Sequence, residues 1–187
     1  GKTFQGMHVF EGFYMDEEFI DPFDVEEVTT KDELDVHVYV RYTDAGNWEF
    51  EQGTFTFNYN AASGMWESNN QKQSSKTASI KIYPVGGPIR ITFKLYANSE
   101  GGSYDYAHYY YDEYNYETGE WKTSRVQSAK TGGTSTTIDD AISCDLIIPY
   151  DANNPTKGVE ISYRKDPSGD KGTDTAYVVD LTINGIK

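Results

Sequence analysis

Cysteine, histidine and positive charge are all scarce in this chain of 187 residues. The one cysteine, Cys144, cannot form a disulfide within the chain, so cysteine usage neither supports nor excludes export, and we expect a small buried side chain there. Sixteen basic residues stand against thirty acidic ones, and the formal charge of −14 repels phosphate backbones and anionic membrane surfaces. No apolar run approaches the roughly 20 residues that span a bilayer. We therefore expect neither a nucleic-acid partner nor membrane insertion.

The sequence also lacks the motifs of common catalytic sites. It has no nucleophile elbow, no glycine-rich phosphate loop and no helical zinc motif. None of the three histidines, His8, His37 and His108, has a second histidine or a cysteine at metal-ligand spacing. Thirty acidic residues allow many carboxylate pairs, but their abundance alone does not point to a glycosidase. We interpret the chain as a non-enzyme.

What the chain does have is aromatic residues, at 15%, and apolar residues that alternate with polar ones. The segment Ile89–Asn98 shows this period of two clearly, and no long stretch shows the 3.6-residue period of a helix. The sequence therefore predicts an all-β, antiparallel, jelly-roll-like β-sandwich without a helix longer than about 12 residues. We expect one domain over residues 1–187. A split at 68–79 into an N-terminal β subdomain and a C-terminal jelly-roll is the alternative.

Two strand pairs stand out in the alternation pattern. Asp35–Asn60 predicts a hairpin that turns at Asp44–Asn47 and returns from Trp48. Gly158–Lys187 predicts a second, hairpin-like pair around an acidic loop. In the second pair we expect four side chains to be largely buried, namely Tyr163, Tyr177, Val179 and Leu181.

The C-terminal half carries a resemblance to a known family. The residues that carry it are Tyr163–Asp166, Ser168, Gly172, Asp174 and Tyr177, preceded by Ser103–Tyr106. This pattern resembles the jelly-roll β-sandwich modules of Bacteroidetes surface proteins, which occur beside leucine-rich repeats and in cleaved-adhesin-like chains. It covers roughly Ile89–Lys187. The resemblance implies a lipoprotein or secreted adhesion module outside the cell, and we interpret Gly1 as the point where a signal or lipoprotein segment was removed.

A second resemblance uses the middle of the chain. The segments Phe55–Asn69 and Ser79–Asn98 are similar to the fimbrillin-like pilin subunits of the same bacteria. Two functions therefore stay open. The first is a monomeric, non-catalytic surface module that recognises a glycan or a protein, and the second is a structural pilin subunit.

Tyrosines supply the candidate ligand contacts. In the tyrosine-rich segment Ser99–Tyr114, Tyr106 and Tyr110 would share one strand face, and Trp48 is expected to be exposed at its hairpin turn. Exposed rings could stack on sugars or anchor a protein partner, so these three residues are our predicted contacts. The alternative is that tyrosine serves only as a strand former in a solvated sandwich.

The acidic loop between the last two strands is the candidate metal site. Asp166, Asp170 and Asp174 recur at four-residue spacing and could turn their carboxylates toward one point. We expect no cofactor and take the aspartates as structural by default, because Lys165 and Lys171 can neutralise them and one can cap the turn. The alternative is a calcium site with these three aspartates as its ligands, since calcium prefers such oxygen clusters.

Overall fold

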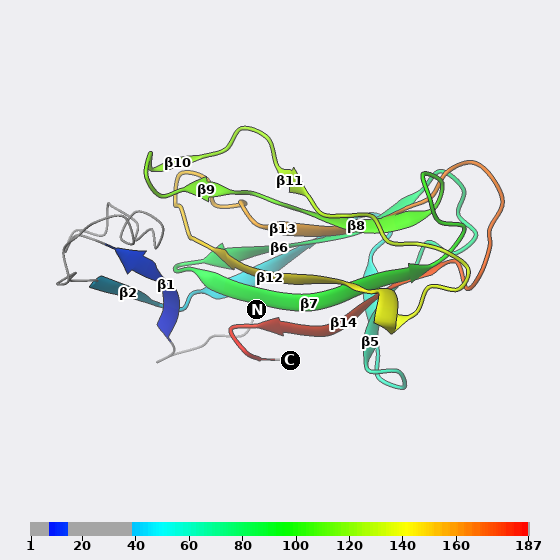
Figure 1. Ribbon diagram of the computed structural model, residues 1–187, viewed down its shortest axis with the longest axis horizontal. Coiled ribbons are helices and arrows are strands. Elements are labelled where there is room, and N and C mark those ends of the chain that lie inside the picture. Colours follow the sequence, from blue (N-terminus) through cyan, green and yellow to red (C-terminus); the bar gives the residue numbers. More distant parts are fainter. Residues whose placement is uncertain (1–7, 15–38, 187) are drawn as a thin grey trace, which may run out of the picture.

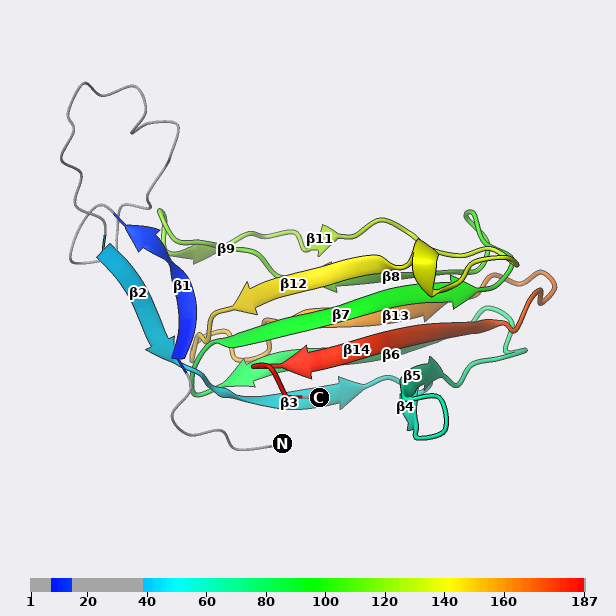
Figure 2. The same cartoon turned by 60° about the horizontal axis from the view of Figure 1, so that its bottom comes forward.

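The computed structural model describes residues 8–14 and 39–186 of the chain. Two five-stranded sheets pack face to face, and every strand pair within them is antiparallel (Figures 1 and 2). Sheet I has the order β11-β8-β13-β6-β3 and sheet II the order β12-β7-β14-β5-β4. Among the described residues the longest helical element is a three-residue 3-10 turn, η1 (Ile138–Asp140). The predicted all-β sandwich is confirmed.

The strands are short, as is usual for a sandwich. Sheet I consists of β3 (Asn47–Gln52), β6 (Thr77–Val85), β8 (Tyr106–Tyr111), β11 (Val126–Gln127) and β13 (Val159–Arg164). Sheet II consists of β4 (Phe57–Asn60), β5 (Met65–Ser68), β7 (Ile89–Asn98), β12 (Ile142–Ile148) and β14 (Thr175–Ile183). Two ribbons of two strands complete the fold: β1 (His8–Tyr14) with β2 (Tyr39–Asp44), and β9 (Tyr114–Asn115) with β10 (Glu120–Trp121).

The core lies between the two sheets and follows the alternation of the sequence. Ile80 and Ile82 of β6 and Ile161 of β13 point inward from sheet I, and Ile91 and Leu95 of β7 meet them from sheet II. Each such side chain contributes roughly 1.5–3 kcal/mol when it leaves water. Cys144 belongs to this core as a buried free thiol, as expected.

Both sheets combine strands from before and after the polar segment 68–79. Sheet I joins β3 to four later strands, and sheet II joins β4 and β5 to three later strands. Within the segment, the buried Asn70 amide donates to the carbonyls of Lys76 and Tyr163 at 3.1 and 3.2 Å. This polar stretch is therefore tied to β13 by a buried hydrogen bond.

The predicted hairpin over Asp35–Asn60 is wrong. β2 pairs with β1, whereas β3 pairs with β6. The chain passes between them at Gly46, whose N–H donates to the Pro88 carbonyl at 2.8 Å. A Cβ atom at Gly46 would lie 2.0 Å from the Gly87 carbonyl oxygen, so only glycine allows this close passage.

The predicted pairing of the last two strands is also wrong, although both contribute to the core. β13 lies between β8 and β6 in sheet I, and β14 lies between β7 and β5 in sheet II. The acidic loop therefore crosses from one sheet to the other.

The inward phase of β14 changes along the strand. Tyr163 and Val179 are buried as predicted, but Tyr177 and Leu181 are only partly buried. Tyr177 stacks on Tyr96 at a ring distance of 4.8 Å, while the preceding and following residues are in the core. A register shift between Val179 and Thr182, with Asp180 at φ 52°, resets the phase so that Ile183 is again buried.

Candidate functional site

An aromatic depression of about 480 Å³ lies beside the bulge of β14. We call it the aromatic pocket and define it by its lining residues Tyr59, Gly64, Trp66, Asp180 and Leu181. β14 pairs with β5 only through Tyr177 and Val178, and the bulge begins directly afterwards. The pocket therefore forms where β14 stops pairing with β5.

The β4–β5 hairpin places the two rings of the pocket. Tyr59 and Trp66 are cross-strand partners, and their rings meet edge to face at 5.6 Å. The turn between them closes with a 2.8 Å hydrogen bond from the Gly64 N–H to the Asn60 carbonyl. Gly64 has φ 72°, a left-handed conformation that glycine adopts without a steric cost. Cross-strand aromatic pairing thus fixes both rings.

The pocket is surrounded by exposed aromatic surface. The Tyr59 residue is 57% exposed, and Phe50 of β3, whose ring lies 6.3 Å from that of Trp66, is 39% exposed. Asp180 adds a carboxylate to the lining. Aromatic faces beside a hydrogen-bond acceptor suit a ligand that has apolar C–H faces and hydroxyl groups.

Sequence reasoning missed most of this site. It selected neither Tyr59 nor Trp66 as a ligand contact. The available signal was the short turn at 61–64, because a tight turn makes the flanking rings cross-strand neighbours. Asp180 and Leu181 carried no comparable signal, since a bulge at a residue other than glycine cannot be read from alternation.

The structure does not bring the three predicted ligand contacts together at an exposed surface. Trp48 is 4% exposed and belongs to the core, so the expectation that it is exposed is wrong.

Tyr106 is also 4% exposed. Lys130 Nζ lies 4.1 Å from its ring centroid, and Arg164 donates to its hydroxyl at 3.0 Å. Tyr110 is half-buried, with the Arg125 guanidinium 4.7 Å from its ring centroid. Cationic side chains therefore already pack against Tyr106 and Tyr110.

His108 lies between these two tyrosines on β8. Its ring is 5.4 Å from that of Tyr106 and 4.6 Å from that of Tyr110. Both ring nitrogens are buried, and neither has a hydrogen-bond partner among the described residues. Desolvation, helped by the nearby Lys130, lowers the pKa of His108 to about 4. The imidazole is therefore neutral at physiological pH.

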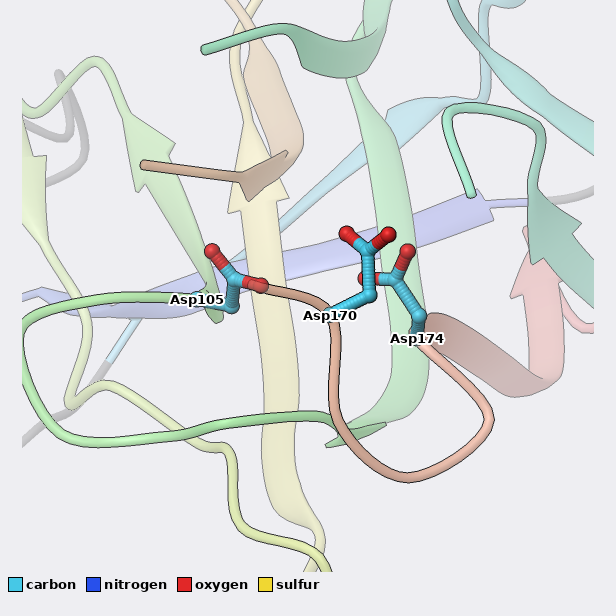
Figure 3. A group of neighbouring side chains, drawn as sticks. All are labelled: Asp105, Asp170 and Asp174. Carbon is cyan, nitrogen blue, oxygen red and sulfur yellow. The ribbon is translucent and has the colours of Figure 1, made fainter. Parts of the chain in front are cut away.

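A second cluster gathers three aspartates around a buried lysine. Carboxylate oxygens of Asp105, Asp170 and Asp174 lie within 4.8 Å of one another (Figure 3). The Lys165 ammonium is fully buried and contacts all three: it pairs with Asp174 Oδ2, with Asp170 Oδ1 at 2.5 Å, and with Asp105 Oδ2 at 3.9 Å. We call these four residues the Lys165 cluster.

The cluster contains two of the three predicted calcium ligands and replaces the third. The Asp166 carboxylate accepts instead from the Ser168 N–H at 2.7 Å, and its own N–H donates to Asp105 Oδ1 at 2.9 Å. Asp105 comes from the segment before β8 and was not predicted. The Lys165 ammonium lies where a cation would bind, and calcium binding stays a prediction.

The charges of the cluster respond to burial in different ways. Desolvation raises the pKa of Asp105, and the hydrogen bond from Lys165 lowers the pKa of Asp170. Desolvation opposes the charged form of Lys165, but its hydrogen bonds to Asp170 and Asp174 raise its pKa overall. The cluster therefore combines an ammonium, two carboxylates paired with it and a third, buried carboxyl group whose pKa is raised.

No protein-family model matches the chain, and no curated protein matches it. Among solved structures, it is similar to carbohydrate-binding modules of family 29. One mutant, described as a probe of the mechanism of ligand recognition, is 14% identical with a TM-score of 0.35, and the match covers 74% of this chain and 83% of that one. Another structure of a family 29 module is 15% identical with a TM-score of 0.33, covering 73% and 76% of the two chains. The resemblance to Bacteroidetes surface modules stays a prediction.

Proposed function

We propose that the protein is a non-catalytic binding module that recognises a glycan at the aromatic pocket. The observation that carries this proposal is the pair of Tyr59 and Trp66, which line the pocket in fixed mutual geometry while Tyr59 stays more than half exposed. A ring that stays more than half exposed leaves apolar surface in contact with water, and a ligand that covers this surface gains binding energy from it.

The chemistry of the lining favours a sugar over a purely apolar ligand. The C–H face of a pyranose packs on an aromatic ring, while its hydroxyls donate to a carboxylate such as Asp180. The net charge of −14 disfavours acidic polymers. The preferred ligand is therefore a neutral glycan.

A location outside the cell suits this function, because many neutral polysaccharides are found there. We propose a secreted or cell-surface protein that acts as a monomer. None of the described residues forms a helix with the length and apolar character that crossing a membrane requires.

Binding to a glycan array tests the proposal. We expect the chain to bind neutral glycans, and Tyr59→Ala to weaken that binding by about 1–2 kcal/mol, a factor of roughly 5–30. Tyr104→Ala is the matched control, because Tyr104 is 53% exposed and does not line the pocket. A chain that binds no glycan, or equal losses in the two variants, would contradict the proposal.

The pilin alternative makes a different prediction. A pilin subunit polymerises or exchanges strands after its N-terminal segment is trimmed, whereas a binding module stays monomeric. Light scattering before and after limited proteolysis separates the two, and polymer formation would favour the pilin.

A further inference from the structure

Lys165 is the most enclosed charged side chain of the Lys165 cluster. It follows the last residue of β13 in sheet I, and Asp174 immediately precedes β14 in sheet II. The Lys165 side chain is 0% exposed and that of Asp174 is 5% exposed. An amine and a carboxyl group are thus held in direct contact, out of water, at the base of the loop that connects the two sheets.

The Asp174 carboxyl group is also polarised from both sides. The Tyr163 hydroxyl donates to its Oδ1 at 2.8 Å, and the Lys72 N–H donates to its Oδ2 at 2.5 Å. Fixed donors at both oxygens can stabilise the negative charge that appears when a nucleophile attacks the carboxyl carbon. The Asp170 carboxylate is less enclosed than that of Asp174, because its side chain is 31% exposed.

Asp105 supplies the third chemical group. It is 0% exposed, and its Oδ2 has no hydrogen-bond partner among the described residues although Lys165 Nζ lies 3.9 Å away. Desolvation raises the pKa of this carboxyl group, so it accepts a proton more readily than an exposed aspartate does. Figure 3 shows Asp105 approaching from a different chain segment than Asp170 and Asp174, which share the loop.

We propose that Lys165 and Asp174 join through an amide bond that the folded chain forms by itself. Lys165 Nζ loses a proton and attacks Asp174 Cγ, so an N–C bond forms. One C–O bond of the carboxyl group then breaks, and that oxygen leaves as water. Ammonium and carboxylate together contain every atom of the amide and the water, so no oxidant or further reactant is needed. Asp105 relays the proton from the amine to the leaving oxygen.

Proximity and exclusion of water make this step feasible. Well-oriented intramolecular reactions reach effective molarities of about 10⁵–10⁸ M, and a buried site also keeps out the water that would reverse the reaction. The product would close the loop Asp166–Thr173 covalently and link sheet I to sheet II. Because the pKa of Lys165 is raised, its ammonium must lose a proton to a neighbouring group before the amine can attack.

The mass of the intact chain tests the proposal directly. We expect the purified protein, after incubation at neutral pH, to be lighter than its sequence by one water molecule. Trypsin should fail to cleave after Lys165, and the digest should contain one branched peptide that joins Lys165 to Asp174. A chain with the full sequence mass and normal cleavage after Lys165 would overturn the proposal without any variant.

Three variants locate the chemistry. Lys165→Arg should restore the full mass, because a guanidinium does not form this amide. Asp105→Asn keeps an acceptor for the Asp166 N–H but cannot relay a proton, so the fraction of linked chain should fall at least tenfold at equal times. Asp139→Asn, at an exposed position outside the Lys165 cluster, is the matched control and should link like the parent. Linkage that survives Asp105→Asn unchanged would refute the role of Asp105, and a branched peptide that joins Lys165 to Asp170 would refute the choice of Asp174.

Discussion

Asn184 joins three segments that are far apart in the sequence. It follows the last residue of β14 and is buried, with φ 53°. Its Oδ1 accepts from the Arg90 N–H at 2.9 Å and its Nδ2 donates to the Gly46 carbonyl at 3.0 Å. Its own N–H donates to the Arg90 carbonyl at 2.8 Å. The side chain therefore ties β14 to the start of β7 and to the crossing at Gly46.

We expect Asn184→Ala to lower the free energy of unfolding by about 4 kcal/mol. Two partners lose their hydrogen bonds at a buried site, at about 1–3 kcal/mol for each unsatisfied group. Alanine also tolerates the left-handed conformation poorly, at about 1–2 kcal/mol. Because the stability of a domain is typically about 5–15 kcal/mol, this single change should remove a large part of it.

Chemical denaturation in urea measures the loss, and a second variant separates its causes. Asn184→Gly removes the amide but adopts φ 53° freely, so it should be about 1 kcal/mol more stable than Asn184→Ala. Asn153→Ala, at an exposed position, should stay within about 0.5 kcal/mol of the parent. Loss of less than about 1 kcal/mol in both Asn184 variants would refute the reasoning, because the hydrogen bonds would then carry no net stability.

Three further outcomes are expected. The fold favours the neutral form of His108, whose pKa is about 4 in the folded state against about 6.5 in the unfolded state. Its contribution to the free energy of unfolding is therefore fully present above about pH 6.5 and is lost as the pH falls toward 4. His108→Phe should lose up to about 3 kcal/mol less stability than the parent over this range, as measured by urea unfolding at both pH values. An unchanged pH dependence would contradict the burial of an uncharged ring. Burial raises the pKa of Cys144 to about 12, so iodoacetamide should label this thiol only after unfolding, and rapid labelling of the native chain would show that it is accessible. Millimolar calcium should leave the melting temperature unchanged, since the Lys165 nitrogen already contacts Asp170 and Asp174, whereas a rise that disappears in Asp170→Ala would establish the calcium site.

Alternation in the sequence predicted strands well, but not their partners. The run Ile89–Asn98 is β7 over the same residues, and the alternation from Val159 to Arg164 is β13. Periodicity reports which face of a strand is apolar, and either sheet of a sandwich can accept such a face. The two predicted hairpins are wrong because the strands have other partners: at Asp44–Asn47 the chain passes from the β1–β2 ribbon to sheet I, and across the acidic loop it passes from sheet I to sheet II.

The candidate sites were harder to predict because their residues come together over long distances. Asp105 meets Lys165 across sixty positions, and a local spacing rule selected Asp166 instead. Trp48 was expected at an exposed turn, but that expectation depended on the hairpin that does not form. Because the predicted strand pairing was wrong, the predicted exposure of Trp48 was wrong too. Tyr59 and Trp66 were within reach, since their relation depends only on the short turn between them.

β14 connects the two proposed sites and supplies part of the lining of the aromatic pocket. The strand begins directly after Asp174 in the Lys165 cluster, and it pairs with β7 on both sides of its bulge, through Val179 and Thr182. Asp180 and Leu181 therefore line the pocket from a paired strand rather than from a free loop. A binding surface held in this way loses little conformational entropy when it takes up a ligand. Weaker binding in Tyr59→Ala would therefore not come from displacement of Asp180 and Leu181, because the pairing of β14 with β7 does not depend on Tyr59.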